Sequence, residues 1–179
     1  NEVYTLEDNA TVVFYDDGTL YIDEGATLNG GNNTTLILAN WSFNYATAPG
    51  TWNPDTSTVI WRGGSLPAEA TSFYNLRIQS STAALSADIT VINDLVIESG
   101  ASLDAGGYTV TLGGNMTVEG TFTASTSTVI FDKAGVTGTG GTQTITSSLS
   151  SQTLEFYNLQ VNASNTLSLG DLYSNWVII

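Results

Sequence analysis

The sequence GTWNPDTSTVIW at residues 50–61 returns as GTFTASTSTVIF at residues 120–131, 70 positions further along the chain. Two shorter blocks return with it in the same order, namely IDEGATL at 22–28 as IESGASL at 97–103, and SFYNLRI at 72–78 as EFYNLQV at 155–161. Blocks that recur in a fixed order indicate a chain built from repeated supersecondary units.

The repeated units have a β pattern throughout. Short runs rich in β-branched residues, such as TVTL at 109–112 and MTV at 116–118, are separated by glycine-rich turns. No stretch shows a sustained period of 3.6 residues, so we expect almost no helix. A unit of 75 residues, the offset between 22 and 97, is too long for one coil. It fits three coils of the usual length of about 20–29 residues. The predicted fold is therefore an all-β, repeat-built β-solenoid, and the alternative is two tandem β-sandwich domains.

The repeats divide the chain into three parts. Residues 1–20 form a partial opening unit, residues 21–95 the first repeat unit, and residues 96–179 a second unit that ends where a third would start. The second unit carries extra residues at 135–151, rich in Gly, Thr and Ser, which we expect to form an exposed loop or a longer turn.

The blocks at 97–112, 121–131 and 156–161 resemble the repeats of large secreted prokaryotic β-solenoid surface proteins and adhesins. The resemblance extends over nearly the whole chain and concerns architecture, because the motifs are degenerate. It implies display at the cell surface and no defined ligand. The first unit departs from the pattern by Trp41, Trp52 and Trp61 and by extra residues at 44–50.

Composition limits the partners of the chain. Its 17 acidic residues outnumber 3 scattered basic ones, which gives a net charge of −14 and leaves no basic patch for nucleic acid or an anionic membrane. We expect no membrane insertion, since no apolar run reaches the length of about 18 residues needed to span a bilayer. Thr, Ser and Asn take the place of charged residues, as is common in extracellular β-fibres, so we expect an extracellular or cell-surface location.

The sequence lacks the residue types that most often act in catalysis. The chain contains neither His nor Cys, which removes the usual general base, metal ligand and thiol nucleophile. We therefore expect no enzymatic activity and no resident cofactor. Two acidic turns are weak candidates for calcium, although such residues are more often solvated turn formers. They contain Asp16, Asp17, Asp23 and Glu24.

An aromatic cluster marks the first repeat unit. Trp41, Tyr45 and Trp52 flank its extra residues and form a candidate contact surface for a sugar ring or another subunit. The alternative is that both tryptophans fill the core, where they match Met116 and Phe122 of the second unit.

Six asparagines precede x-Ser/Thr and are candidate N-glycosylation sites. They are Asn9, Asn32, Asn33, Asn40, Asn115 and Asn162. In a chain this rich in Ser and Thr, several such motifs arise by chance.

Both ends of the chain carry apolar strand sequences without a polar cap, and solenoids normally need caps. These residues are the candidate assembly interface, namely Val12, Val13 and Phe14 at one end and Trp176, Val177, Ile178 and Ile179 at the other. They favour a structural subunit of an extracellular filament or surface layer that assembles with itself head to tail, with strand donation as one route. The alternative is a stalk or glycan-binding segment cut from a larger surface adhesin.

Overall fold

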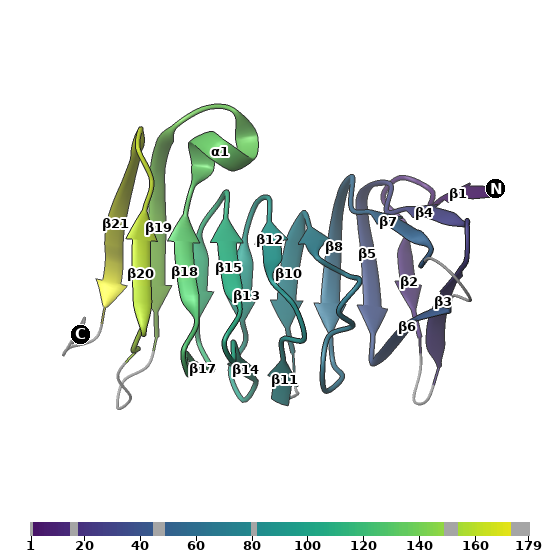
Figure 1. The fold of residues 1–179 in the computed structure, drawn as a ribbon, viewed down its shortest axis with the longest axis horizontal. Coiled ribbons are helices and arrows are strands. Elements are labelled where there is room, and N and C mark those ends of the chain that lie inside the picture. The colour runs from purple at the N-terminus through teal and green to yellow at the C-terminus, as the bar shows by residue number, and fades with distance from the viewer. Residues whose placement is uncertain (1, 15–17, 45–48, 80–81, 149–153, 173–179) are drawn as a thin grey trace.

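The computed structural model describes residues 2–14, 18–44, 49–79, 82–148 and 154–172. It shows the β-solenoid that the repeats predict, and this solenoid has about seven turns, with the first and last coils at opposite ends (Figure 1). All strand pairs in the described residues are parallel, because each coil lies on the previous one with the same direction. The alternative of two sandwich domains is not what the chain forms.

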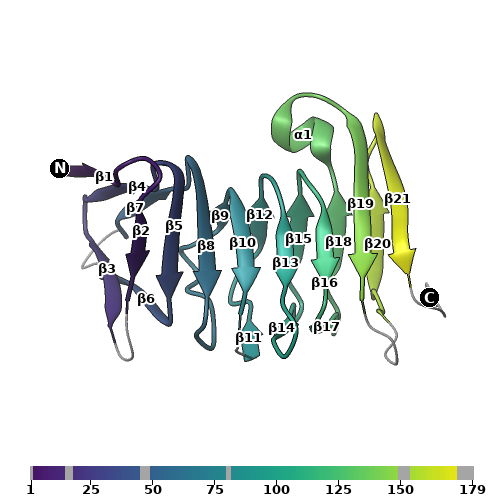
Figure 2. The ribbon, with the colours of Figure 1, turned by 180° about the vertical axis from the view of Figure 1, so that it is seen from behind.

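One sheet, here called the long sheet, runs through the whole stack (Figure 2). In the described residues it contains eight strands in the order β2 (Thr11–Val13), β5 (Asn32–Leu38), β8 (Thr56–Trp61), β10 (Asn75–Ile78), β13 (Leu95–Ile97), β16 (Met116–Val118), β19 (Gly141–Ser147) and β21 (Asn165–Leu172).

The other sides of the coils form shorter sheets. The largest has the order β20 (Asn158–Val161), β18 (Thr128–Phe131), β15 (Thr109–Leu112), β12 (Ile89–Val91) and β9 (Ser72–Phe73). A narrow sheet contains β11 (Thr82–Ala84), β14 (Ser102–Asp104) and β17 (Thr121–Thr123). The first coils form two more, β1 (Val3–Thr5) with β4 (Thr27–Asn29) and β7 (Thr51–Asn53), and β3 (Thr19–Asp23) with β6 (Asn40–Asn44).

The core consists of apolar rows that run from coil to coil. Along the strands buried and outward-facing residues alternate, as the two-residue period of a β-strand requires. In the long sheet one inward row follows the paired residues of successive strands, namely Val12, Leu36, Val59, Leu76, Leu95, Met116, Ile145 and Leu169. Six inner members of this row, Leu36 to Ile145, are at most 1% exposed.

Polar ladders fix the corner where the chain enters the long sheet. Asn75 Nδ2 donates to Thr58 Oγ1 at 3.2 Å, and Asn75 Oδ1 accepts from Asn93 Nδ2 at 2.9 Å. The row continues through Asp94, whose Oδ1 accepts from the backbone N–H of Asn115 at 2.9 Å. Ladder partners lie 17 to 24 residues apart in this half of the molecule, close to the coil length expected from the repeats.

The sequence repeat has a defined structural meaning. In the first unit the blocks at 50–61 and 72–78 contain β8 and β10, and in the second unit the blocks at 120–131 and 155–161 contain β18 and β20. Both strand pairs have the same register. Thr58 pairs with Asn75 in the first, and Thr128 pairs with Asn158 in the second. However, β8 belongs to the long sheet and β18 to the five-stranded sheet. The repeated sequence therefore specifies how one coil lies on the next and is compatible with either side of the coil.

The insertion at 135–151 differs in part from the expected loop. It contains most of the short helix α1 (Lys133–Thr137), which lies outside the stack, and the strand β19 (Figure 1). The inward positions of β19 include Gln143, whose Nε2 donates to the backbone carbonyls of Leu112 and Gly114 at 2.9 and 2.6 Å. Because polar residues occupy inward positions of β19, the alternation of hydrophobicity that signals a strand is weak there. No helix in the described residues is long and apolar enough to cross a membrane.

Candidate assembly interface

The exposed large apolar side chains gather at the two ends of the solenoid. Within the described residues these side chains, each at least 42% exposed, are Val3, Tyr4, Tyr21, Tyr157, Val161 and Leu169. The first three belong to β1 and β3 of the first coil, and the last three lie in or beside β20 and β21 of the last one. The sides of the stack between these coils have no such residue among those that the structure describes.

At the C-terminal end, exposure follows from the position of these residues in the core rows. Leu169 pairs with Ile145 and Val161 pairs with Phe131, and both inner partners are 0% exposed. Leu169 and Val161 are 45% and 42% exposed because no described coil lies on their outer side. The last coil thus presents residues of core type to the outside.

The backbone is open at the same places. Among the described strands, β2 pairs with β5 alone and β21 with β19 alone, so each has one edge without a neighbouring strand. The edges of β1, β3 and β20 are open in the same way. Such an edge presents a row of N–H and C=O groups that can pair with another strand.

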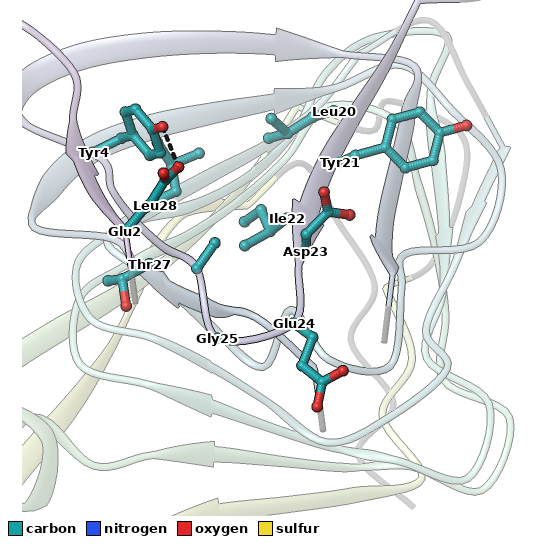
Figure 3. A pocket seen from close by; sticks show the side chains of 11 residues that line it. Glu2, Tyr4, Leu20, Tyr21, Ile22, Asp23, Glu24, Gly25, Thr27 and Leu28 are labelled. Atoms are coloured by element: carbon teal, nitrogen blue, oxygen red, sulfur yellow. Dashed lines mark hydrogen bonds between the residues drawn. The ribbon is translucent and has the colours of Figure 1, made fainter. Parts of the chain in front are cut away.

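The first coil also carries a pocket of about 440 Å³ (Figure 3). Leu20, Ile22 and Leu28 belong to its lining and are part of the core or pack against it. Figure 3 shows Tyr4 with Glu2 on one side of these apolar residues and Tyr21 on the other. At this pocket the hydrophobic core is therefore accessible from the N-terminal end of the solenoid, and the pocket is called the mouth below.

Carboxylates belong to this mouth as well. Glu2, Asp23 and Glu24 line the pocket. The hydroxyl of Tyr4 donates a hydrogen bond to Glu2 Oε2, and this bond together with the charge of Glu2 raises the pKa of Tyr4 above its usual value. The mouth is therefore apolar inside and negatively charged around it, which suits an apolar partner that does not add further acidic groups.

The structure places part of the predicted assembly interface at the same end. Val12 and Val13 lie in the edge strand β2 and are half-buried. Phe14 follows them, with its backbone N–H bonded to the carbonyl of Ile37 at 3.0 Å. The other predicted segment, Trp176, Val177, Ile178 and Ile179, lies outside the described residues.

The tryptophans predicted as a contact surface are in the core. Trp41 and Trp52 are 7% and 8% exposed, and their rings meet edge to face at a centroid distance of 5.1 Å. Trp52 Nε1 donates to the backbone carbonyl of Ser72 at 3.0 Å. The structure therefore favours the core-filling alternative for this pair, since a buried ring offers no platform for a sugar. Tyr45 lies outside the described residues.

The six sequon asparagines have different surroundings. Four of them use their side-chain amide as a donor to a neighbouring coil, namely Asn32 to Asp8, Asn33 to Asn9, Asn115 to Asp94 and Asn162 to Asp132. Asn9 takes part as the acceptor of the bond from Asn33, and Asn40 is exposed. A glycan on any of the four amides would compete with the ladder that the same nitrogen forms.

Of the weak calcium candidates, Asp23 and Glu24 are exposed beside the pocket, and Asp16 and Asp17 lie outside the described residues. The part of the chain that the structure describes contains no group of three or more acidic side chains placed to hold a metal ion.

The end residues Tyr4, Tyr21, Tyr157, Val161 and Leu169 were missed by sequence reasoning. Singly exposed apolar residues look like core residues in a sequence, and a coil with neighbours on both sides has the same pattern as one without. The signal that identifies them is their register, since Leu169 continues a row that is buried at Ile145.

Comparison with protein-family models, with curated proteins and with solved structures finds no match to this chain.

Proposed function

We propose that this protein is a structural subunit of an extracellular filament or cell-surface layer, in which copies join head to tail through their end coils. The observation that carries the proposal is that, among the residues that the structure describes, exposed large apolar side chains occur only in the first and last coils. Covering them on association would remove apolar surface from water at both ends, which favours association. A contact between two different surfaces of the same chain does not close on itself in a straight rod and therefore produces a filament.

The resemblance to surface-protein repeats supports an extracellular role, and so does the replacement of charged residues by Thr, Ser and Asn. The stacked parallel coils support a mechanical role, because their hydrogen bonds and core rows extend along one axis. In this proposal the protein is not an enzyme, has no cofactor and has itself as its main partner.

The same open ends fit a second function, a stalk segment of a larger surface adhesin. There, further coils of one longer chain would cover Tyr4 at one end and Leu169 at the other. Both functions need the ends to be covered, and they differ in whether the cover belongs to the same chain.

The test is the state of the purified chain of residues 1–179 at physiological salt, measured by sedimentation velocity and negative-stain electron microscopy. We expect filaments whose width matches one solenoid. Intact mass spectrometry of the native material then separates the two functions, because a filament subunit has a mass near 18.8 kDa plus any glycans. Monomers without filaments at 100 µM would refute the assembling subunit.

A further inference from the structure

Among the described strands the long sheet has an unpaired edge at β2 and another at β21, and the same rows of residues run from one edge to the other. Resting on the proposed head-to-tail assembly, we infer that β2 of one copy adds in parallel to β21 of the next and continues the long sheet across the junction. In the register that follows from the rows, Thr11 lies beside Ser168 and Val12 beside Leu169. The partner at this edge is thus a second copy of the chain, bound strand to strand.

The register follows from the pairing inside one molecule. The row through Val12 ends at Leu169, and the outward row beside it begins at Thr11 and ends at Ser168. The steps through Leu76, Leu95 and Met116 keep this register without a slip. If a neighbouring copy keeps this register, its Val12 lies beside Leu169 of the preceding copy and its Thr11 lies beside Ser168.

Burial favours the same register. Leu169 is 45% exposed, whereas its neighbour Ile145 in the same row is 0% exposed. Val12 at the other edge is half-buried. Placing Val12 on Leu169 gives each an apolar neighbour on its open side. A shift by one residue would bring the outward-facing Thr11 or Val13 onto the inward Leu169, because successive side chains alternate between the two faces.

The shape of β21 limits where pairing can occur. Its register with β19 is regular from Asn165 to Leu169 and shifts beyond that point. A shift of this kind bends a strand and disturbs its ladder. The inferred contact at Ser168 and Leu169 lies at the end of the regular part of β21. Since β2 has only three residues, two of its three pairs fall within this regular part.

Charge sets the polarity of the contact. Residues 1–24 contain seven acidic and no basic residues, whereas residues 141–179 contain two acidic residues and no basic ones. Two N-terminal ends brought together would face each other with like charges. Joining the acidic end to the nearly neutral end avoids most of that repulsion.

A single molecule cannot make this contact with itself. The eight described strands, about 4.8 Å apart, place β2 and β21 about 34 Å from each other. These two strands lie at opposite ends of the rod (Figure 2). The strand that completes β21 therefore comes from another copy.

The chain contains no cysteine, so introduced pairs can be read without background. In the double variant Thr11→Cys with Ser168→Cys, the two sulfurs belong to neighbouring strands whose Cα atoms are about 4.8 Å apart across the junction, within the range of a disulfide. Both side chains face outward, so we expect the fold to persist, as checked by circular dichroism. Under mild oxidation we expect a ladder of dimers, trimers and higher species on non-reducing gels.

Three controls define the contact. The single variant Thr11→Cys forms dimers if two N-terminal ends meet each other. The single variant Ser168→Cys forms dimers if two C-terminal ends meet. Strong dimers from either single variant would therefore overturn the inferred polarity. Thr11→Cys with Thr166→Cys displaces the second cysteine by two residues, about 6.6 Å, along the strand. Equal cross-linking of this pair would overturn the register.

The outcomes separate the inference from the proposed function. Filaments seen by electron microscopy without a ladder from the Thr11→Cys/Ser168→Cys variant would refute the β2–β21 contact and leave the filament proposal standing. The absence of both filaments and ladder would refute both.

Discussion

Asn75 joins three coils through a single side chain. Its amide donates to Thr58 on one side, and its Oδ1 accepts from the side chain of Asn93 and the backbone N–H of Asp94 on the other. The ordered stacking of asparagines along a sheet is a known source of stability in cross-β structures. A residue in this position holds the corner of three successive turns.

We predict that Asn75→Ala lowers the free energy of unfolding by about 1–3 kcal/mol, because it leaves partly buried donors without their partner. Urea unfolding followed by circular dichroism measures the change. The matched control is Asn158→Ala, since Asn158 occupies the equivalent place in the repeat and is exposed at the end of the stack, with a bond to Thr128 at 3.3 Å. Equal losses in the two variants would contradict the role of the inner ladder.

Single residues were the hardest level to predict from the sequence. Asn115 and Asn162 were recognised as sequons, yet in the fold their amides bond to Asp94 and Asp132. The sequon is defined by residue types alone and does not indicate which residue of the neighbouring coil the asparagine amide bonds to. The tryptophans show the same difficulty, because the sequence does not display that the ring of Trp41 meets those of Trp52 and Phe73, at centroid distances of 5.1 and 6.3 Å.

At the level of elements, a charged network follows the ends of β8, β10 and β13. Arg62 Nε donates to Gln79 Oε1 at 2.8 Å, and Gln79 Nε2 donates to Glu98 Oε2 at 2.6 Å. Arg77 Nε donates to Glu98 Oε1 at 2.9 Å. Burial by itself would raise the pKa of Glu98, but the hydrogen bonds from Gln79 and Arg77 and the nearby positive charges outweigh it, so the pKa is lowered.

Because the pKa of Glu98 is lower in the folded state, its stabilising contribution is complete above the ordinary glutamate pKa of about 4.3 and is lost as the pH falls through the folded value. We predict that Glu98→Gln destabilises the fold at pH 7 by at most about 1 kcal/mol, since the pair is partly exposed. The difference from the unmodified protein should shrink toward pH 3 in urea titrations. The control Glu119→Gln changes an exposed carboxylate of the next coil. A deficit for Glu98→Gln that is the same at pH 7 and pH 3 would contradict the network.

The apolar row of the long sheet gives a second test at this level. We predict that Leu76→Ala, in the middle of the row, costs about 2–5 kcal/mol of stability, because it leaves a cavity in a packed core. Leu169→Ala, at the open end, should cost the monomer much less and should weaken assembly instead. Urea unfolding and sedimentation velocity on both variants separate the two effects. Undiminished assembly of a folded Leu169→Ala variant would count against this end as an interface.

The elements themselves were largely predictable. Repeated blocks, β-branched alternation and glycine turns predicted stacked coils of about the observed length. The strand β19 was not predicted, because Gln143 and Ser147 occupy inward positions where the pattern calls for apolar residues. The amide of Gln143 is compatible with the interior since it bonds to two backbone carbonyls of the preceding coil, and a sequence does not display such a bond.

At the level of the whole molecule, the net charge of −14 opposes association of copies. The Debye length falls from about 30 Å at 0.01 M salt to about 8 Å at 0.15 M, so salt screens this repulsion while leaving apolar contacts in place. We predict that filament formation, followed by light scattering, increases between these two salt concentrations. Disassembly on raising the salt over this range would show that ion pairs, rather than apolar end coils, hold the copies together.

The axial repeat of the proposed filament distinguishes head-to-tail joining of the end coils from other modes of assembly. The eight strands that the structure describes in the long sheet, at about 4.8 Å each, give a subunit length of about 38 Å along the axis when one copy continues the stack of the next. Electron micrographs of filaments assembled from the purified chain yield this repeat by Fourier analysis. We predict a repeat near 38 Å together with a strand spacing of about 4.8 Å along the same axis. A repeat near 77 Å, as expected for copies joined head to head, or the absence of filaments at physiological salt, would contradict it.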